Sequence, residues 1–383
     1  MSKVAVLRTK PQSIIEDYSN LLDKINYKSI LKNSEINTII KINLSWSLFF
    51  PACSTPPWQL DGVLKKITED GTKPETVIPT ENQTVVTHPW KGAYLNKWLE
   101  VFNKYNVKYR PLTNEKWIPY DPKADVPYMR ELFKDKIIIP EIYLNSNMIH
   151  LPTIKTHGHT TITGALKNAF GGLIPKYRHH SHRVIHEILV DLLTIQKEIH
   201  QGILAITDGT ISGDGAGPRV MDPFVSNLLL ASEDQVAIDA ISAKIMGFDP
   251  LKIKFIKMAH DQGLGTGDLD QIDLIGMDLA EFNSIDLNFH AERSLIVRWD
   301  QRIRNTTYRY RVLRPIHTLL FHTPIFRLFI ATSEIYHDRI WYPISGKRKI
   351  KEFESTEWGP IWEKYSYGEK LKEYPKIQNW NRY

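Results

Sequence analysis

The densest group of chemically versatile side chains is a set of histidines between residues 150 and 186. Seven of the chain's 14 histidines fall within this segment of 37 residues. They are His150, His157, His159, His179, His180, His182 and His186. Imidazole exchanges protons near neutral pH, and it also binds metals and anions. The sequence therefore predicts a site for one of these chemistries here.

Residues 154–168 contain part of this set and begin where a predicted strand ends. Loops at the carboxyl ends of parallel strands line ligand crevices, and the N-terminus of a following helix offers unpaired N–H groups to anions. The side chains suited to a phosphate or carboxylate are Lys155, Thr160, Thr161, Thr163, Lys167 and Asn168. The residue order of a phosphate loop is missing. The alternative is an ordinary helix capped by threonine, with its lysines facing water.

His157 is the residue that we expect to act as a general acid or base, or to hydrogen-bond the substrate. Lys155 and Lys167 would hold or polarise the anion. A group of cationic histidines at residues 179–183 could also clamp an anion.

A metal site is the other interpretation of the histidines. The candidate ligands are His157 and His159, which alternate along an extended segment, and His182 and His186, at i and i+4 of a predicted helix. Two histidines and a carboxylate, either Asp191 or Asp208, could bind Zn or Fe(II). No zincin pattern is present.

A second group of polar residues follows another predicted strand end, at Asp208. A glycine-rich segment, residues 213–218, comes next and leads to Arg219. Such a loop lets the backbone approach a ligand while the guanidinium offers two parallel donors. We expect Asp208 to orient His157 or a ligand hydroxyl. A long turn capped by Asp208 is the equally weighted alternative.

The N-terminal half offers Lys41 and Asn43, which share one side of a strand end by alternation. We assign both to substrate binding. Each of them alone would more often be structural.

The elements that must position these residues are short apolar, β-branched runs alternating with helical patterns. The runs are residues 4–7, 38–42, 84–86, 137–139, 147–151, 203–206 and 227–231. Runs that are apolar on both faces predict an α/β fold with a mainly parallel sheet flanked by helices, possibly in two lobes. A capping-box pattern at residues 232–235 predicts a helix over 236–246. Residues 1–285 would form this catalytic or binding domain, and residues 286–383 a basic, aromatic-rich helical extension.

The net charge of +6 is unevenly distributed. Residues 293–350 carry twelve Lys or Arg against three acids, a net +9, which leaves −3 for the rest. The single cysteine, Cys53, can form no internal disulfide and no iron–sulfur cluster by itself. Without a signal-peptide core or an apolar run of about 20 residues, we expect a cytoplasmic protein.

The basic extension includes an apolar stretch, residues 316–331, that follows an arginine cluster and has aromatic residues near it. This composition fits peripheral contact with a membrane surface. It fits equally a helix packed on the body or on a second subunit. Nucleic-acid binding is not favoured, because no recognised module accompanies the charge.

Taken together and in this order, the motifs resemble the family called domain of unknown function 362. The matching segments are residues 41–44, 151–157, 163–168, 208–209 with 213–218, and 231–239, with Ile42 where the family usually has proline. Some members of the family carry a ferredoxin-like iron–sulfur module. This chain lacks the cysteines for it, so no cluster is expected here and any redox cofactor is unknown. The resemblance makes a redox reaction plausible.

We therefore expect an enzyme that binds an anionic, possibly lipid-linked small molecule between the Lys155–His157 loop, the helix start at Lys167 and the Asp208 loop. The reaction type is undetermined. Two alternatives stay open, a non-catalytic or electron-transfer accessory subunit and a metal enzyme with histidine ligands.

Overall fold

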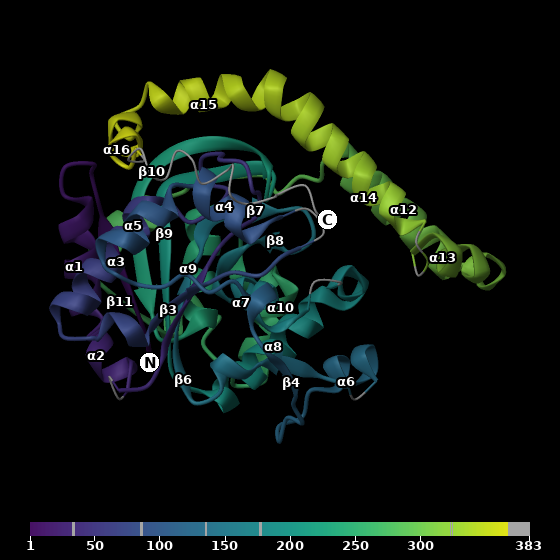
Figure 1. The fold of residues 1–383 in the computed structure, drawn as a ribbon, viewed down its shortest axis with the longest axis horizontal. Coiled ribbons are helices and arrows are strands. Elements are labelled where there is room, and N and C mark those ends of the chain that lie inside the picture. Colours follow the sequence, from purple (N-terminus) through teal and green to yellow (C-terminus); the bar gives the residue numbers. More distant parts are fainter. Residues whose placement is uncertain are drawn as a thin grey trace.

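A computed structural model of the chain describes residues 1–32, 35–84, 87–134, 136–175, 178–321, 323 and 325–366. Its centre is a nine-stranded sheet with the path β11-β1-β10-β9-β6-β2-β3, while β7 pairs with β9 and β8 (Figure 1). The strands are β1 (Ser2–Arg8), β2 (Thr38–Ile42), β3 (Val77–Thr80), β6 (Ser146–Leu151), β7 (Thr153–His157), β8 (Thr161–Ile162), β9 (His200–Ala216), β10 (Val220–Ser232) and β11 (Ile272–Ile275). A separate ribbon pairs β4 (Trp117–Pro119) with β5 (Ile138–Pro140).

Most strand pairs are parallel, as the buried β-branched runs predict. The parallel pairs are β2–β3, β2–β6, β6–β9, β7–β9 and β1–β11. Strand β10 is antiparallel to both of its neighbours. The prediction of an α/β fold with a mainly parallel sheet is confirmed.

Helices cover both faces of the sheet and bury one apolar cluster on each side. One cluster includes α7 (Gly164–Leu173), α8 (Ile185–Ile199), α9 (Gln235–Ile245) and α10 (Lys254–Asp261). The other includes α1 (Ile14–Lys24), α3 (Pro57–Glu69) and α5 (Trp98–Lys104). The remaining helices of the body are α2 (Tyr27–Ile30), α4 (Pro89–Leu95), α6 (Pro127–Phe133) and α11 (Leu279–Ser284).

Local expectations are met to different degrees. The run 38–42 coincides with β2, and α9 forms where its capping signal lies, although Asp234 rather than Ser232 caps it by accepting the N–H groups of Val236 and Ala237. The predicted strand 84–86 is not found at Thr84, and residues 85–86 lie outside the described residues. The strand beside β2 is β3 instead.

The strand that contains Asp208 does not end there, contrary to our expectation. Strand β9 continues to Ala216 because its second half pairs with β10 in a long antiparallel ribbon, with Asp214 opposite Asp222. The glycine-rich segment is therefore largely strand, and the turn lies near the cis peptide between Gly217 and Pro218.

The extension runs away from the sheet and returns to it (Figure 1). It consists of α12 (Leu295–Arg309), α13 (Arg314–Phe321), α14 (Phe326–Glu334), a π-helical segment (Ile335–Gly346), α15 (Lys347–Glu354) and α16 (Gly359–Lys364). We call residues 295–334 the arm. The final part packs on the body, where Phe353, Trp358 and Trp362 belong to the apolar cluster of α1, α3 and α5.

Candidate functional site

Lys155 lies in β7 and is fully buried. Its Nζ donates hydrogen bonds to Asn43 Oδ1 at 2.5 Å, Thr153 Oγ1 at 2.6 Å and the carbonyl of Cys53 at 3.0 Å. These acceptors are neutral oxygens, and burial lowers the pKa of Lys155 to about 8. The structure thus brings together two of the predicted site residues, Lys155 and Asn43. Their contact fastens the loop after β2 onto β7.

Lys41 is also buried, and it forms an ion pair inside the protein. Its Nζ lies 2.8 Å from each carboxylate oxygen of Glu81 and 2.6 Å from the carbonyl of Ile42. Asn168 packs against the same strand, since its amide donates to the backbone carbonyl of Lys41 at 2.9 Å. Glu81 therefore neutralises the charge that we expected to meet a substrate.

Three histidines form a row beside Lys167. The ring centroids of His157 and His159 are 5.7 Å apart, and those of His159 and His182 are 5.0 Å apart. The Lys167 ammonium lies 5.9 Å from the ring centroid of Phe170, which itself contacts His182. We call His157, His159, His182 and Lys167 the histidine cluster.

The extension supplies further positive charge to the histidine cluster. Gln301 of α12 contacts the Nδ1 atom of His159 at 2.5 Å, and Arg293 donates to the carbonyl of Gly158 at 2.9 Å. Burial lowers the pKa of His159 to about 4, helped by the charges of Lys167, Arg293 and Arg304. Burial and then Lys167 likewise hold the pKa of His157 well below its ordinary value. Both rings are therefore neutral at pH 7.

The N-terminus of α7, where we expected a bound anion, is capped by one of the protein's own carboxyl groups. The N–H groups of Ala165 and Leu166 donate to the two carboxylate oxygens of Asp239, at 2.5 and 3.0 Å. Gly164 has φ +67° and leaves the space that this carboxylate fills. Thr163 does not cap the helix with its side chain, and its buried hydroxyl has no hydrogen-bond partner among the described residues.

Asp208 is held on the side of α1 and α3. Its carboxylate accepts hydrogen bonds from Tyr18 at 2.5 Å, from Trp58 at 3.1 Å, and from the hydroxyl and backbone of Thr210 at 2.7 and 3.0 Å. Burial raises its pKa to about 6. None of these bonds comes from His157, whose Nδ1 accepts the N–H of His159. The expectation that Asp208 orients His157 is therefore wrong in this structure.

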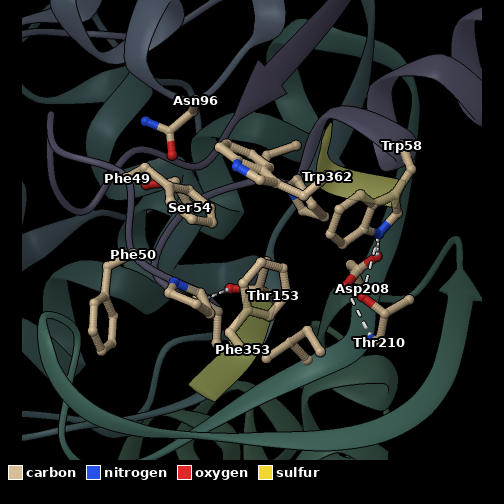
Figure 2. A pocket seen from close by; sticks show the side chains of 15 residues that line it. Phe49, Phe50, Ser54, Trp58, Asn96, Thr153, Asp208, Thr210, Phe353 and Trp362 are labelled. Carbon is tan, nitrogen blue, oxygen red and sulfur yellow. Dashed lines mark hydrogen bonds between the residues drawn. The ribbon is translucent and has the colours of Figure 1, made fainter. Parts of the chain in front are cut away.

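A small pocket is lined by Asp208 and by aromatic side chains that include Phe353 of α15 and Trp362 of α16 (Figure 2). Asp208 and Thr153 are among its polar lining residues, and Phe49, Phe353 and Trp362 are among its aromatic ones. The cavity of about 20 Å³ has room for roughly one water molecule. The Phe49 and Trp362 rings stack with centroids 3.6 Å apart and narrow the space.

Arg219 lies outside the histidine cluster. It follows the turn between β9 and β10 and donates to Ser333 of α14 at 3.4 Å. Its acidic neighbours are Glu334, the last residue of α14, and Asp338 of the π-helical segment. The predicted ligand-binding arginine thus joins the sheet to the extension.

The metal-ligand set that we considered is not assembled. Within the described ranges, no three His, Cys, Asp or Glu side chains are placed to hold one ion. His186 stacks on Phe255 with ring centroids 5.8 Å apart, and Asp191 accepts the N–H of Met129 at 2.7 Å. The four histidines therefore do not converge as a ligand set.

Cys53 is expected to resist thiol reagents in the folded protein. It is fully buried beside the carbonyl of Pro218, and burial raises its pKa to about 11, so that little reactive thiolate forms at pH 8. A chromogenic disulfide reagent should give no rapid signal with native protein and one thiol per chain in guanidinium. Because this cysteine is the only one, rapid labelling of the native protein would contradict the placement.

Sequence reasoning missed two features of the histidine cluster. It gave no role to Gln301 and did not connect Arg293 and Arg304 with His159, because nothing local in the sequence indicates a contact across more than 130 residues. It gave Asp239 a structural role within its own helix, with a place facing the crevice as the alternative, whereas the carboxyl group of Asp239 caps α7. The grouping of histidines and the charge of the extension were the available signals.

Comparisons with known proteins give two matches and a negative result. The model of the family described as "Domain of unknown function (DUF362)" matches residues 38–244. A thylakoid-associated protein from Synechocystis sp. is 32% identical over 121 residues, which are 31% of this chain and 37% of that protein. The match thus spans little more than a third of the relative. No solved structure gives a significant match.

Proposed function

The chain belongs to the DUF362 family, and on that premise we propose that it is an enzyme that binds an anionic small molecule at the histidine cluster. The ligand would carry a phosphate or a carboxylate. The observation that carries the proposal is the row of three imidazoles close to Lys167, in which the ring of His159 lies next to those of His157 and His182. Arg293 and Gln301 of the extension are joined to the same loop.

The charges around the cluster favour an anion. Lys167, Arg293 and Arg304 all lower the pKa of His159, so a bound anion would relieve a repulsion that protonation of this ring now meets. The anion would raise the pKa of His157 by the same reasoning. His157 could then hold a proton and deliver it to the bound ligand as a general acid.

Two further groups have the chemistry for binding. Lys167 can pair with the negative charge, and the unpartnered hydroxyl of Thr163 at the adjoining helix start can donate a hydrogen bond. Lys155 and Asn43 position this site, because their hydrogen bond fixes β7, the strand that ends at His157. In this proposal their role is positioning.

Pyrophosphate is expected to raise the melting temperature of the wild-type protein. The variant Lys167→Met should bind pyrophosphate about 10- to 100-fold more weakly, because a hydrogen bond to a charged group contributes about 1.5–3 kcal/mol. His157→Gln should weaken binding less and should remove turnover once a substrate is known. Titration calorimetry gives the dissociation constants.

Lys257→Met serves as the matched control, because Lys257 is an exposed lysine that pairs with Asp261 on α10. It should bind pyrophosphate as the wild type does. Equal affinity of the Lys167 and Lys257 variants would refute the cluster as the anion site.

We also propose that the protein works peripherally at a membrane. None of the described helices combines the length and apolar character that crossing a bilayer requires. Support comes from the net +9 of residues 293–350 and from the relative whose name describes it as thylakoid-associated. An anionic substrate at such a surface could be attached to a lipid.

A further inference from the structure

The arm presents an unusual number of apolar and aromatic side chains to solvent. Val312 is 82% exposed, Leu328 67% and Trp299 61%. The other members of this set are Tyr308, Tyr310, Ile316, Leu319 and Ile325. Large groups of exposed apolar side chains on one element mark an interaction surface.

The same element is strongly basic over most of its length. Residues 301–331 contain six arginines and no Asp, Glu or Lys. Arg302, Arg309, Arg311 and Arg314 are exposed. Residues 301–331 therefore combine exposed apolar area with positive charge and contain no acidic residue that would compensate it; the two acids of the arm, Asp300 and Glu334, lie at its ends.

Apart from Tyr308, which contacts His317, these exposed residues are not the ones that hold the arm together. Phe321 is buried, and the guanidinium of Arg304 lies 4.1 Å from its ring centroid. His317 packs against both Phe321 and Tyr308. The arm thus has its own internal contacts, and the exposed set faces outward.

The arm is fixed to the body at both ends. At its start, Gln301 contacts His159, and Arg183 donates to Tyr308 at 3.0 Å. Beyond its end, Trp341 and Tyr342 pack on Trp46 with ring centroids 6.0 and 5.1 Å away. In Figure 1 the arm projects from the sheet between these two attachments.

We infer that the arm docks on the surface of an anionic lipid bilayer. Its apolar and aromatic side chains enter the headgroup boundary, and its arginines contact lipid phosphates. The inference rests on the membrane association proposed above. It adds that the arm is the element that binds and that the lipids are anionic.

A second copy of the chain fits this surface less well. A symmetric dimer places the same patch on both subunits, so the arginines of one arm would meet those of the other. An anionic bilayer complements the charge and the apolar area together.

The test is flotation of the full-length protein with vesicles of phosphatidylcholine alone or with phosphatidylglycerol. The wild type should float with the anionic vesicles only. Val312→Ser/Leu319→Ser and Arg309→Gln/Arg311→Gln should each lower the bound fraction by about tenfold. All four residues are exposed, so the variants should unfold at the wild-type temperature.

Matched controls lie on the body of the protein. Leu279, which is 64% exposed on α11, is the control for the loss of exposed apolar area. Lys252 and Lys257 together are the control for the loss of two positive charges. Leu279→Ser and Lys252→Gln/Lys257→Gln should float as the wild type does.

The outcomes separate the two claims. If the wild type floats with neither vesicle, the membrane association itself fails. If the wild type floats and the arm variants float equally well, only the inference about the arm fails. Equal flotation with neutral vesicles overturns the assignment of lipid charge. A dimer in lipid-free solution that Val312→Ser/Leu319→Ser dissociates makes the arm a subunit interface and overturns the inference.

Discussion

Replacing Lys41 by methionine is expected to lower the free energy of unfolding by about 3–5 kcal/mol. The ammonium is buried and contacts both carboxylate oxygens of Glu81, so its removal leaves an uncompensated carboxylate inside the protein. Urea unfolding followed by circular dichroism measures the change.

Two controls make the result specific to burial. Lys116→Met removes a lysine at the same 2.8 Å from a carboxylate, that of Glu141, but these side chains are 69% and 48% exposed, so the cost should stay below about 1 kcal/mol. The double variant Lys41→Met/Glu81→Leu should recover much of the lost stability, because it removes both buried charges. A Lys41 variant as stable as the Lys116 variant would show that the ammonium is not structural.

Asp239 is expected to make stability fall as the pH rises. Burial raises its pKa from 3.8 to about 8, against the opposing effect of its two backbone hydrogen bonds. The folded protein therefore binds this proton more tightly than the unfolded chain does. Its contribution to stability is complete below pH 3.8 and is lost as the pH rises through 8.

The size of this effect follows from about 1.4 kcal/mol for each pKa unit. Between pH 5 and pH 7, the wild type should lose about 3 kcal/mol relative to Asp239→Asn, whose amide stays neutral. Urea unfolding at pH 5, 6 and 7 gives the difference. Asp278→Asn, at an exposed position before α11, should follow the wild type. Parallel curves for the wild type and Asp239→Asn would rule out a buried protonated acid.

Several strands and helix α9 could be predicted from the sequence because their signals are local. Strand β2 is an uninterrupted β-branched run, and α9 begins at a polar capping residue. The end of β9 could not be predicted in the same way. The glycines and the aspartate at residues 213–216 are typical of a loop, yet the partner strand β10 supplies hydrogen bonds that keep them in a strand.

In the candidate site, too, local features could be predicted and contacts between distant residues could not. The clustering of His157, His159 and His182 was visible in the sequence because these residues are close in the chain. The partners of the buried charges were not visible, since Lys41 meets Glu81 across 40 residues and Leu166 meets Asp239 across 73. Residue type alone could not distinguish a lysine that binds a ligand from one that pairs inside the fold.

The packing of Trp358 on the body has a consequence for the order of folding during synthesis. Its ring lies 5.2 Å from that of Trp58, on the apolar face formed by α1, α3 and α5. The two tryptophans are separated by 300 residues in the chain. At about 5–20 residues per second, the ribosome needs about 15–60 s to pass from one to the other. During that time the nascent chain exposes the part of this face that Phe353, Trp358 and Trp362 later cover, and it offers a binding surface to chaperones.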